Sequence, residues 1–304
     1  MTVVTLGETM MALRTTGLLR LGGSARTSIA GAETTVAIGL SRLGHSARWV
    51  SRLGRDEPGE LILRTLRAEG VDVSAVSRDD APTGLIFFEE RLPDLVRVQY
   101  YRANSAATRL GPDDVRTAVS GDVSLVHLSG ITAGLGEGPR SAVEAALDIA
   151  AERGATVSFD INFRSKLWSP ETAADVLTPL IRRADVVIGS TGELDLVGGV
   201  ESLLAAGVGE VVTKLGAGGA ESATVDGKVS APGNRVEVVD SIGAGDAFTS
   251  GYLSAFLDGL PAPERLARGN ACGAFAVSTS GDWEGLPTRS ELALLDVEKG
   301  EALR

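Results

Sequence analysis

Cysteine and histidine are scarce in this chain of 304 residues. Cys272 is its one cysteine, so a disulfide within the chain is impossible and a reduced, cytoplasmic setting is expected. Cys272 lies in an Ala/Gly-rich helical run, which predicts a buried structural thiol. Of the two histidines, His45 and His127, neither belongs to an H-E-x-x-H arrangement, which disfavours zinc hydrolysis. His127 lies in an apolar strand pattern and fits a structural role better than that of a base.

An excess of basic residues and long apolar runs are also absent. Lys and Arg number 29 against 40 Asp and Glu, which gives a net charge of −11. This balance disfavours general binding of nucleic acids or anionic membranes. No apolar run approaches the ~20 residues that span a bilayer, and Met1–Glu8 lacks the features of a signal peptide. We therefore expect neither nucleic-acid nor membrane partners.

Two common nucleotide-binding motifs are missing. The chain has no G-x-x-x-x-G-K-[ST] loop and no G-x-G-x-x-G fingerprint. Their absence disfavours a Walker-type NTPase and a common dinucleotide oxidoreductase.

Short β-rich runs alternate with helical patterns along the chain. The expected strands are Val3–Leu6, Ala47–Ser51, Val123–Leu128, Ala155–Phe159, Asp185–Ile188 and Glu210–Lys214. The expected helices are Thr34–Leu43, Pro58–Glu69, Pro139–Arg153 and Pro170–Arg183. This rhythm predicts an α/β fold with a mostly parallel central sheet between two helix layers, an α/β/α sandwich. Ligands of such sheets bind beyond the carboxyl ends of the strands.

Two pairs of runs without a helix between them predict antiparallel hairpins. Thr83–Glu90 and Leu95–Arg102 are joined by a short turn at residues 91–94, and Asp226-Gly227 joins Gly219–Val225 to Lys228–Ala231. The first pair predicts a small projecting sheet that acts as a lid. We expect a single domain over residues 1–304, with a lid formed mainly by residues 8–32 and 83–103.

The segment Asp240–Phe248 carries the clearest chemical signal. Gly243, Ala244 and Gly245 precede Asp246 at the start of an apolar, helix-patterned run. Free N–H groups of a first helical turn attract anions, and glycine lets a phosphate approach the backbone. A carboxylate beside an anion site is explained if it removes a proton from an attacking hydroxyl during phosphoryl transfer. The alternative is a glycine-rich turn with Asp246 as an ordinary N-cap.

Two separated segments resemble the signatures of the ribokinase, or PfkB, family of carbohydrate kinases. Asp240–Asp246 is similar to its C-terminal signature, and Ile29–Ala37 with Leu40–Gly44 and Arg52–Gly59 is similar to its N-terminal one. The resemblance covers nearly the whole chain and implies a ribokinase-like fold. It implies that Asp246 is the general base, and that the amides of Gly243, Ala244, Gly245 and Asp246 bind the transferred phosphoryl group.

Within that family the chain most resembles 2-keto-3-deoxygluconate kinases. The supporting stretches are Tyr100–Arg102, Ser105-Ala106, His127–Thr132, Ser158–Arg164 and Leu167–Ser169. The resemblance implies contacts from Tyr100, Arg102 and Arg164 to a sugar acid, because a guanidinium matches a carboxylate. The further residues expected at the substrate are Gly31, Ala32, Glu33 and Ile131. The alternative is that the arginines and the tyrosine are exposed surface residues.

The resemblance also implies residues for ATP and Mg²⁺. Ser190 and Glu193 occupy the family's N-x-x-E positions, with serine in place of asparagine, and Glu193 is expected to act on the metal through water. Lys214, Gly216 and Gly219 match the strand and loop along the nucleotide, and Asn270 matches the helix beside the adenine. For Glu193, Lys214 and Asn270 the alternative is an ordinary exposed side chain. Asp240 is a candidate for holding a monovalent cation.

Three positions depart from the family pattern on the sugar side. Ala30 and Thr35 replace the usual glycine and asparagine, and Ile86 stands where relatives offer a tyrosine. Because these changes remove polar groups, the sugar stays open between 2-keto-3-deoxygluconate and a neutral sugar or nucleoside, as in a fructokinase-like enzyme. An inactive sugar-binding regulator is the alternative from another class. A homodimer joined through the lid is expected, since an exposed apolar sheet face is unfavourable.

Overall fold

The central sheet has nine strands and is parallel except at one edge. The computed structural model describes residues 2–15, 17–92, 95–119 and 122–296. The strand order is β13-β12-β11-β10-β9-β8-β1-β4-β5, and only β12 and β13 run antiparallel to their neighbours. The strands are β1 (Thr2–Leu6), β4 (Ser46–Gly54), β5 (Val76–Asp79), β8 (Val123–Ser129), β9 (Thr156–Asp160), β10 (Val186–Ser190), β11 (Glu210–Lys214), β12 (Ala220–Thr224) and β13 (Gly227–Ala231).

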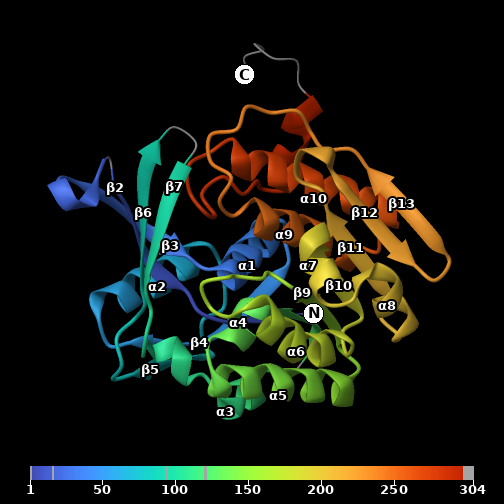
Figure 1. Ribbon diagram of the computed structural model, residues 1–304, viewed down its shortest axis with the longest axis horizontal. Coiled ribbons are helices and arrows are strands. Elements are labelled where there is room, and N and C mark those ends of the chain that lie inside the picture. The colour runs from blue at the N-terminus through green and yellow to red at the C-terminus, as the bar shows by residue number, and fades with distance from the viewer. Residues whose placement is uncertain (1, 16, 93–94, 120–121, 297–304) are drawn as a thin grey trace.

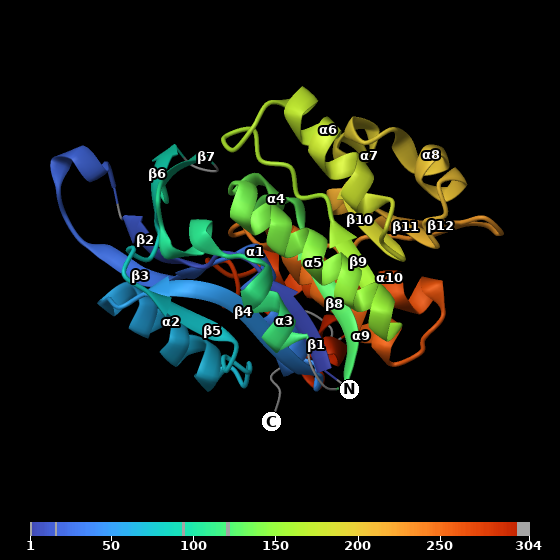
Figure 2. The same ribbon diagram turned by 90° about the horizontal axis from the view of Figure 1, so that it is seen from below.

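Helices cover both faces of this sheet (Figures 1 and 2). One apolar core lies under α1 (Ala32–Arg42), α2 (Glu57–Ala68), α9 (Ala244–Leu257) and α10 (Ala262–Val277). The other lies under α3 (Pro112–Ala118), α4 (Gly130–Gly134), α5 (Glu137–Arg153), α6 (Pro170–Ile181), α7 (Thr191–Leu196) and α8 (Gly199–Ala205). Short 3-10 turns span Leu19–Leu21, Ala106–Arg109, Gly216–Gly218 and Glu291–Asp296. The three-layer α/β/α prediction is therefore confirmed.

Local sequence explains where several helices begin and end. The Asp56 carboxylate accepts a hydrogen bond from Gly59 N at 2.9 Å and caps α2, and Ser169 caps α6 ahead of Pro170. Gly44, at a φ of 89°, and Gly70, at a φ of 75°, follow the ends of α1 and α2. This left-handed backbone costs glycine little.

A second, four-stranded sheet projects from the body beside β4 and α2 (Figure 2). Its order is β3-β2-β6-β7, from β3 (Ala25–Ala30), β2 (Met10–Thr15), β6 (Leu85–Leu92) and β7 (Leu95–Tyr101). The predicted hairpin is confirmed, because β6 and β7 pair antiparallel. We call this sheet the lid. Its inner face carries a buried apolar cluster of Met10, Ala12, Ala30, Ile86 and Phe88.

The structure adds elements and moves some boundaries. Strands β2, β3 and β5 were not expected individually, since their runs are short and interrupted by charge. Thr83, expected at the start of a strand, lies before β6 and donates its hydroxyl to Asp56 at 2.7 Å. Pro93 and Asp94 of the expected turn, and both ends of the expected domain (1 and 297–304), lie outside the described residues. Among the described helices, none combines the length and the apolar character needed to cross a membrane.

Candidate active site

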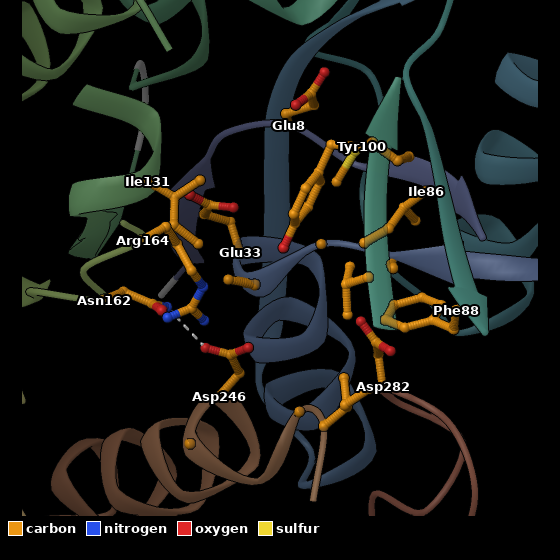
Figure 3. A pocket seen from close by; sticks show the side chains of 18 of the residues that line it. Glu8, Glu33, Ile86, Phe88, Tyr100, Ile131, Asn162, Arg164, Asp246 and Asp282 are labelled. Carbon is orange, nitrogen blue, oxygen red and sulfur yellow. Dashed lines mark hydrogen bonds between the residues drawn. The ribbon is translucent and has the colours of Figure 1, made fainter. Parts of the chain in front are cut away.

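A cavity of about 460 Å³ lies where the lid faces the first turn of α9 and the carboxyl ends of the central strands. Figure 3 shows side chains from lid, body and α9 pointing into it. Its wall includes thirteen of the expected residues: Gly31, Ala32, Glu33, Tyr100, Arg102, Ile131, Arg164, Ser190, Glu193, Lys214, Gly243, Gly245 and Asp246. The structure thus brings together residues that are more than 200 positions apart in the sequence.

The start of α9 forms a cup of backbone N–H groups. Gly243 is its N-cap, with a left-handed φ of 78°. The first helical bond runs from Ala247 N to Gly243 O at 2.8 Å, so the N–H groups of Gly245 and Asp246 precede the helical ladder. A Cβ on Gly243 would lie 2.1 Å from Asp282 O. Only glycine fits this turn, which places the helix start at the cavity.

Asp246 points from the first turn of α9 into the cavity (Figure 3). The amide of Asn162, a residue with a left-handed φ of 43°, donates to Asp246 Oδ1 at 3.1 Å. Burial first, and then the charge of Asp160, raise the pKa of Asp246 to about 6, although Arg164 and Lys214 oppose the rise. Asp246 is therefore not merely an N-cap, because that position belongs to Gly243. A carboxylate with this pKa is a stronger base than an ordinary aspartate and still mostly ionised at neutral pH.

Lys214 lies at the end of β11 below the cup. Its ammonium contacts both oxygens of Asp160, at 3.0 and 2.7 Å, and Thr249 donates to the same carboxylate at 3.0 Å. Burial is the largest single influence and by itself would lower the pKa of Lys214. The charges of Asp160 and Glu193 together outweigh it, so the pKa is raised. Lys214 is consequently a fixed cation rather than an exposed lysine.

Glu193 is committed to local structure. Its Oε1 accepts from Phe163 N at 2.8 Å, and its Oε2 accepts from the backbone and hydroxyl of Ser190, both at 2.8 Å. With Ser190 it forms the capping box of α7. Both residues lie on the wall of the cavity that holds Asp246. Three donors on one carboxylate leave little room for direct metal ligation by Glu193.

The sugar-side arginines differ in their contacts. Arg102 lies one residue beyond β7 and donates to the buried Glu8, at 2.6 Å from Nε and by a second, shorter contact. Ser105 donates to the other oxygen of Glu8 at 2.5 Å, and the Arg102 guanidinium lies 5.3 Å from the Tyr100 ring centroid. Arg164, by contrast, is exposed. Its guanidinium donates to a backbone carbonyl, Phe163 O, at 3.1 Å, so its charge is less neutralised than that of Arg102, which pairs with a carboxylate.

Glu33 occupies the middle of the cavity, between Arg164 and Tyr100 (Figure 3). It is only 1% exposed, and Thr132 donates to its Oε1 at 2.6 Å. Within the described part of the chain, its Oε2 is buried without a hydrogen-bond partner. Burial raises the pKa of Glu33 to about 7, with a smaller contribution from Asp246. A Cβ on Gly7 would lie 2.2 Å from Glu33 Cδ, so that glycine makes room for the carboxyl group.

A second cavity of about 750 Å³ lies on the other side of the cup. Gly216, Gly219, Ala244 and Asn270 line it, and Lys214 and Gly245 line both cavities. The Asn270 amide donates to Ala231 O at 3.1 Å and to Pro232 O at 3.0 Å. Asn270 is therefore a buried support of the loop that follows β13. Ser190 and Glu193 line the first cavity only.

The carboxylate of Asp240 is occupied by protein groups. Its oxygens accept from Ile242 N at 3.0 Å and Gly281 N at 3.3 Å, and Arg14 pairs with it at 2.9 Å. Because a guanidinium already neutralises this carboxylate, we do not propose a monovalent cation there.

Two residues have structural roles. His127 Nδ1 lies 3.2 Å from Ser158 Oγ, and burial lowers the pKa of His127 to about 3. Cys272 is fully buried, and burial raises its pKa to about 12. Neither group is suited to acid–base or nucleophilic chemistry near neutral pH.

Several polar residues of the cavity were not assigned from the sequence. They are Glu8, Asn162 and Asp282 on its wall, with Asp160 and Thr132 behind it. Glu8, Asp160 and Asn162 follow β1 or end β9, so their place after strands was a usable signal. Asp282 lies in an irregular segment after α10, and nothing in its local sequence indicated the site.

Known proteins are similar to this chain along most of its length. The model of the pfkB family of carbohydrate kinases matches residues 2–289. The 2-dehydro-3-deoxygluconokinase of Bacillus subtilis is 37% identical, over 87% of this chain and 85% of its own. The 2-dehydro-3-deoxygalactonokinase of Haloferax volcanii is 35% identical, over 92% of each chain. Fructokinase-1 of Zea mays is 33% identical, over 88% of each.

Solved structures give the same result for the fold. A protein described as a ribokinase II from E. coli, in complex with ATP and Mg²⁺, superimposes with a TM-score of 0.89 at 25% identity. The match covers 97% of this chain and 98% of that one.

Proposed function

The chain belongs to the pfkB family of carbohydrate kinases, and from this premise we propose that it phosphorylates 2-keto-3-deoxygluconate to 2-keto-3-deoxy-6-phosphogluconate. It is an ATP-dependent carbohydrate kinase, and the family uses ATP and Mg²⁺. The observation that carries the catalytic part is Asp246, with its raised pKa, beside the N–H cup of α9.

In the proposed mechanism Asp246 removes the proton of the attacking sugar hydroxyl. The amides of Gly243, Ala244, Gly245 and Asp246 bind the charge that develops on the phosphoryl group. Such donors act strongly because the cup is fixed before the reaction begins. Lys214 lies at the boundary of the two cavities, held by Asp160 at 2.7 Å, and supplies a fixed positive charge between sugar and nucleotide. We assign the nucleotide to the second cavity, along Gly216, Gly219 and Asn270.

The residues present fit Mg²⁺ that is carried mainly by phosphate and water. Within residues 2–15, 17–92, 95–119 and 122–296, no group of three or more acidic, histidine or cysteine side chains forms a metal cage. Mg²⁺ usually keeps several waters and is bound through substrate phosphates. Glu193, held by Ser190 and Phe163, would orient one such water. Bound Mg²⁺ would neutralise charge on the phosphates.

The choice of a sugar acid rests on charge and on the names of the relatives. Arg102 and Arg164 both reach the first cavity, and a guanidinium binds a carboxylate through parallel hydrogen bonds. Tyr100, Gly31, Ala32 and Ile131 form its walls, and Glu33 is positioned for a substrate hydroxyl. Relatives of this chain are named for 2-dehydro-3-deoxygluconate, which is another name for the proposed substrate.

A neutral sugar such as fructose is the second candidate. The observation that favours it is the pairing of Arg102 with the buried Glu8, which neutralises much of the charge that an acid would need. Fructokinases are also among the relatives. Ala30 and Ile86 supply no polar group toward either sugar.

We also propose that two copies associate through the outer face of the lid. Leu13, Phe87 and Tyr101 lie on that face, opposite the buried cluster. Tyr101 is 58% exposed and stacks edge-on against Phe87 at 5.3 Å. Solution mass tests this proposal, and Tyr101→Lys should shift a dimer toward the monomer.

A substrate panel with coupled ADP detection tests the proposed function. We expect 2-keto-3-deoxygluconate to give the highest kcat/KM, ahead of 2-keto-3-deoxygalactonate, fructose and ribose. Faster turnover of fructose would favour the second candidate. No ATP consumption with any sugar would favour the inactive regulator.

A further inference from the structure

Arg14 of the lid reaches across to the loops that carry the N–H cup. It lies on β2 and is 14% exposed at its side chain. Its guanidinium bonds Asp240 at 2.9 Å through one terminal nitrogen and Asp282 at 3.0 Å through the other. The same group lies 4.2 Å from the centroid of the Phe88 ring on β6. The guanidinium of Arg14 therefore connects the inner face of the lid to the two loops of the body that carry Asp240 and Asp282.

Both carboxylates are next to the turn that precedes α9. Asp240 begins this turn and accepts from Ile242 N at 3.0 Å. Asp282 reaches it from the other side, since its carbonyl oxygen would lie 2.1 Å from a Cβ on Gly243. The position of Gly243 in turn decides where the N–H groups of Gly245 and Asp246 point. A shift of either aspartate would therefore displace the cup.

The lid also contacts this turn by packing. Ile242 packs against the apolar cluster on the inner face of the lid. Asp282 and Phe88 both line the first cavity, and Figure 3 shows their side chains there. Apolar contact alone permits sliding, because dispersion and burial have no fixed direction. Two charge-assisted hydrogen bonds, from one guanidinium to two separate carboxylates, add the missing direction.

We infer that Arg14 is a positioning residue for phosphoryl transfer, which fixes the N–H cup and Asp246 through Asp240 and Asp282. It lies behind the cavity wall and acts only through these two carboxylates. The inference depends on the kinase activity and not on which sugar is phosphorylated. It can therefore be tested with whichever sugar the panel identifies.

Arg26 provides a matched control on the neighbouring strand β3. It donates to Ser280 O at 3.1 Å and lies 3.7 Å from Glu284, so it joins the lid to the same segment as Arg14 does. Its side chain is 55% exposed, and within the described part of the chain it contacts Ser280 and Glu284 rather than Asp240 or Asp282. A loss that arose only from loosening the lid would appear in Arg26→Gln as well.

The test compares kcat and KM of Arg14→Gln, Arg14→Lys and Arg26→Gln, each with its thermal unfolding midpoint. We expect Arg14→Gln to lower kcat by about 10- to 100-fold, as a displacement of about 1 Å at a reacting centre can do. The KM of the sugar should change less than threefold (about 0.65 kcal/mol). Arg14→Lys should recover part of kcat, because it restores the charge but not the fork. Arg26→Gln should keep kcat near that of the parent protein.

Two results would overturn the inference. One is an unchanged kcat in a folded Arg14→Gln variant. The other is an equal loss of kcat in Arg14→Gln and Arg26→Gln. If Arg14→Gln fails to fold, a double-mutant cycle of Arg14→Lys, Asp282→Asn and the double variant Arg14→Lys/Asp282→Asn decides the question. If the fold-loss of kcat in the double variant equals the product of the two single losses, coupling through Asp282 is contradicted. A smaller loss than that product would support it.

Discussion

The two cavities that share Lys214 and Gly245 are lined by different kinds of residues. The first is lined by Glu8, Glu33, Arg102, Arg164, Asp246 and Asp282, and most of these charges already have a protein partner. The second is lined mainly by glycines, small apolar side chains and Phe248, with Lys214 and Arg235 as its charged members. The first cavity can therefore select its ligand by charge and hydrogen bonding, whereas the second selects by shape and backbone contacts.

This contrast predicts where substitutions will act. A change in the first cavity should alter the choice of sugar and the pH response. A change in the second should alter the affinity for ATP and leave the sugar largely unaffected. Changes at the shared cup should lower turnover with every sugar.

Gly243→Ala should have the largest effect of the four changes that follow. A Cβ there would lie 2.1 Å from Asp282 O, and φ is 78°, so the turn must move. We expect kcat to fall by about 10²- to 10³-fold, the usual loss when one donor of an oxyanion hole is removed. Gly245→Ala is the matched control, because its Cβ would meet only Lys214 Nζ, at 3.4 Å. A loss under tenfold in this control, and a large loss in Gly243→Ala, is the expected pattern in steady-state kinetics.

The double variant Arg102→Met/Glu8→Gln tests selection by charge. Removing Arg102 alone would leave Glu8 as an unpaired buried charge, which is strongly destabilising, so both partners are changed together. We expect kcat/KM for 2-keto-3-deoxygluconate to fall by about 10- to 100-fold, the value of a charged hydrogen bond of about 1.5–3 kcal/mol. The kcat/KM for fructose should stay within threefold. Equal losses for both sugars would contradict recognition of a carboxylate by Arg102.

Glu33→Gln should separate binding from stability. Burial raises the pKa of Glu33 from 4.5 to about 7, so the carboxylate form penalises the folded state increasingly as pH rises from about 4.5 to 7. The amide removes this penalty. The unfolding midpoint should therefore rise at pH 8 and change little at pH 4.5, while the KM of the sugar increases by about tenfold through loss of a charged acceptor. An equal change in midpoint at both pH values would contradict the raised pKa.

Asn270→Ala should have the smallest effect. Its amide supports the loop at Ala231 and Pro232, and a neutral hydrogen bond contributes about 0.5–1.5 kcal/mol. We expect the KM of ATP to rise by about three- to tenfold, with the KM of the sugar unchanged. A parallel rise in both values would show that the two cavities are not independent.

The repeating part of the fold was predictable from the sequence, and the irregular part was not. The strands β8 to β11 are short, largely apolar runs, and helices follow the first three of them, so composition and period were sufficient to predict this part of the fold. The short strands β2, β3 and β5 carry arginines and polar residues, because each lies at a sheet edge or in the lid. These three strands form because they pair with neighbouring strands, and their own sequences do not indicate it.

The candidate site divides in the same way. Gly243–Asp246 was identifiable because a short contiguous motif builds the cup. The partners of the charged residues were not, since Arg102 meets Glu8 across 94 positions and Arg14 meets Asp282 across 268. The S-x-x-E spacing of Ser190 and Glu193 could have indicated their capping box, but not the hydrogen bond from Phe163 N to Glu193. The charged residues of the site were thus easier to identify from the sequence than the residues with which they pair.

We propose that Asp246 deprotonates the sugar hydroxyl above the N–H cup. Measuring kcat and the sugar dissociation constant of Asp246→Asn together tests it most directly. The amide keeps the shape and can still face Asn162, so sugar affinity should stay within about threefold. We predict that kcat falls by about 10²- to 10⁴-fold, the usual contribution of a general base. Near-normal turnover in a variant that still binds the sugar would contradict the account.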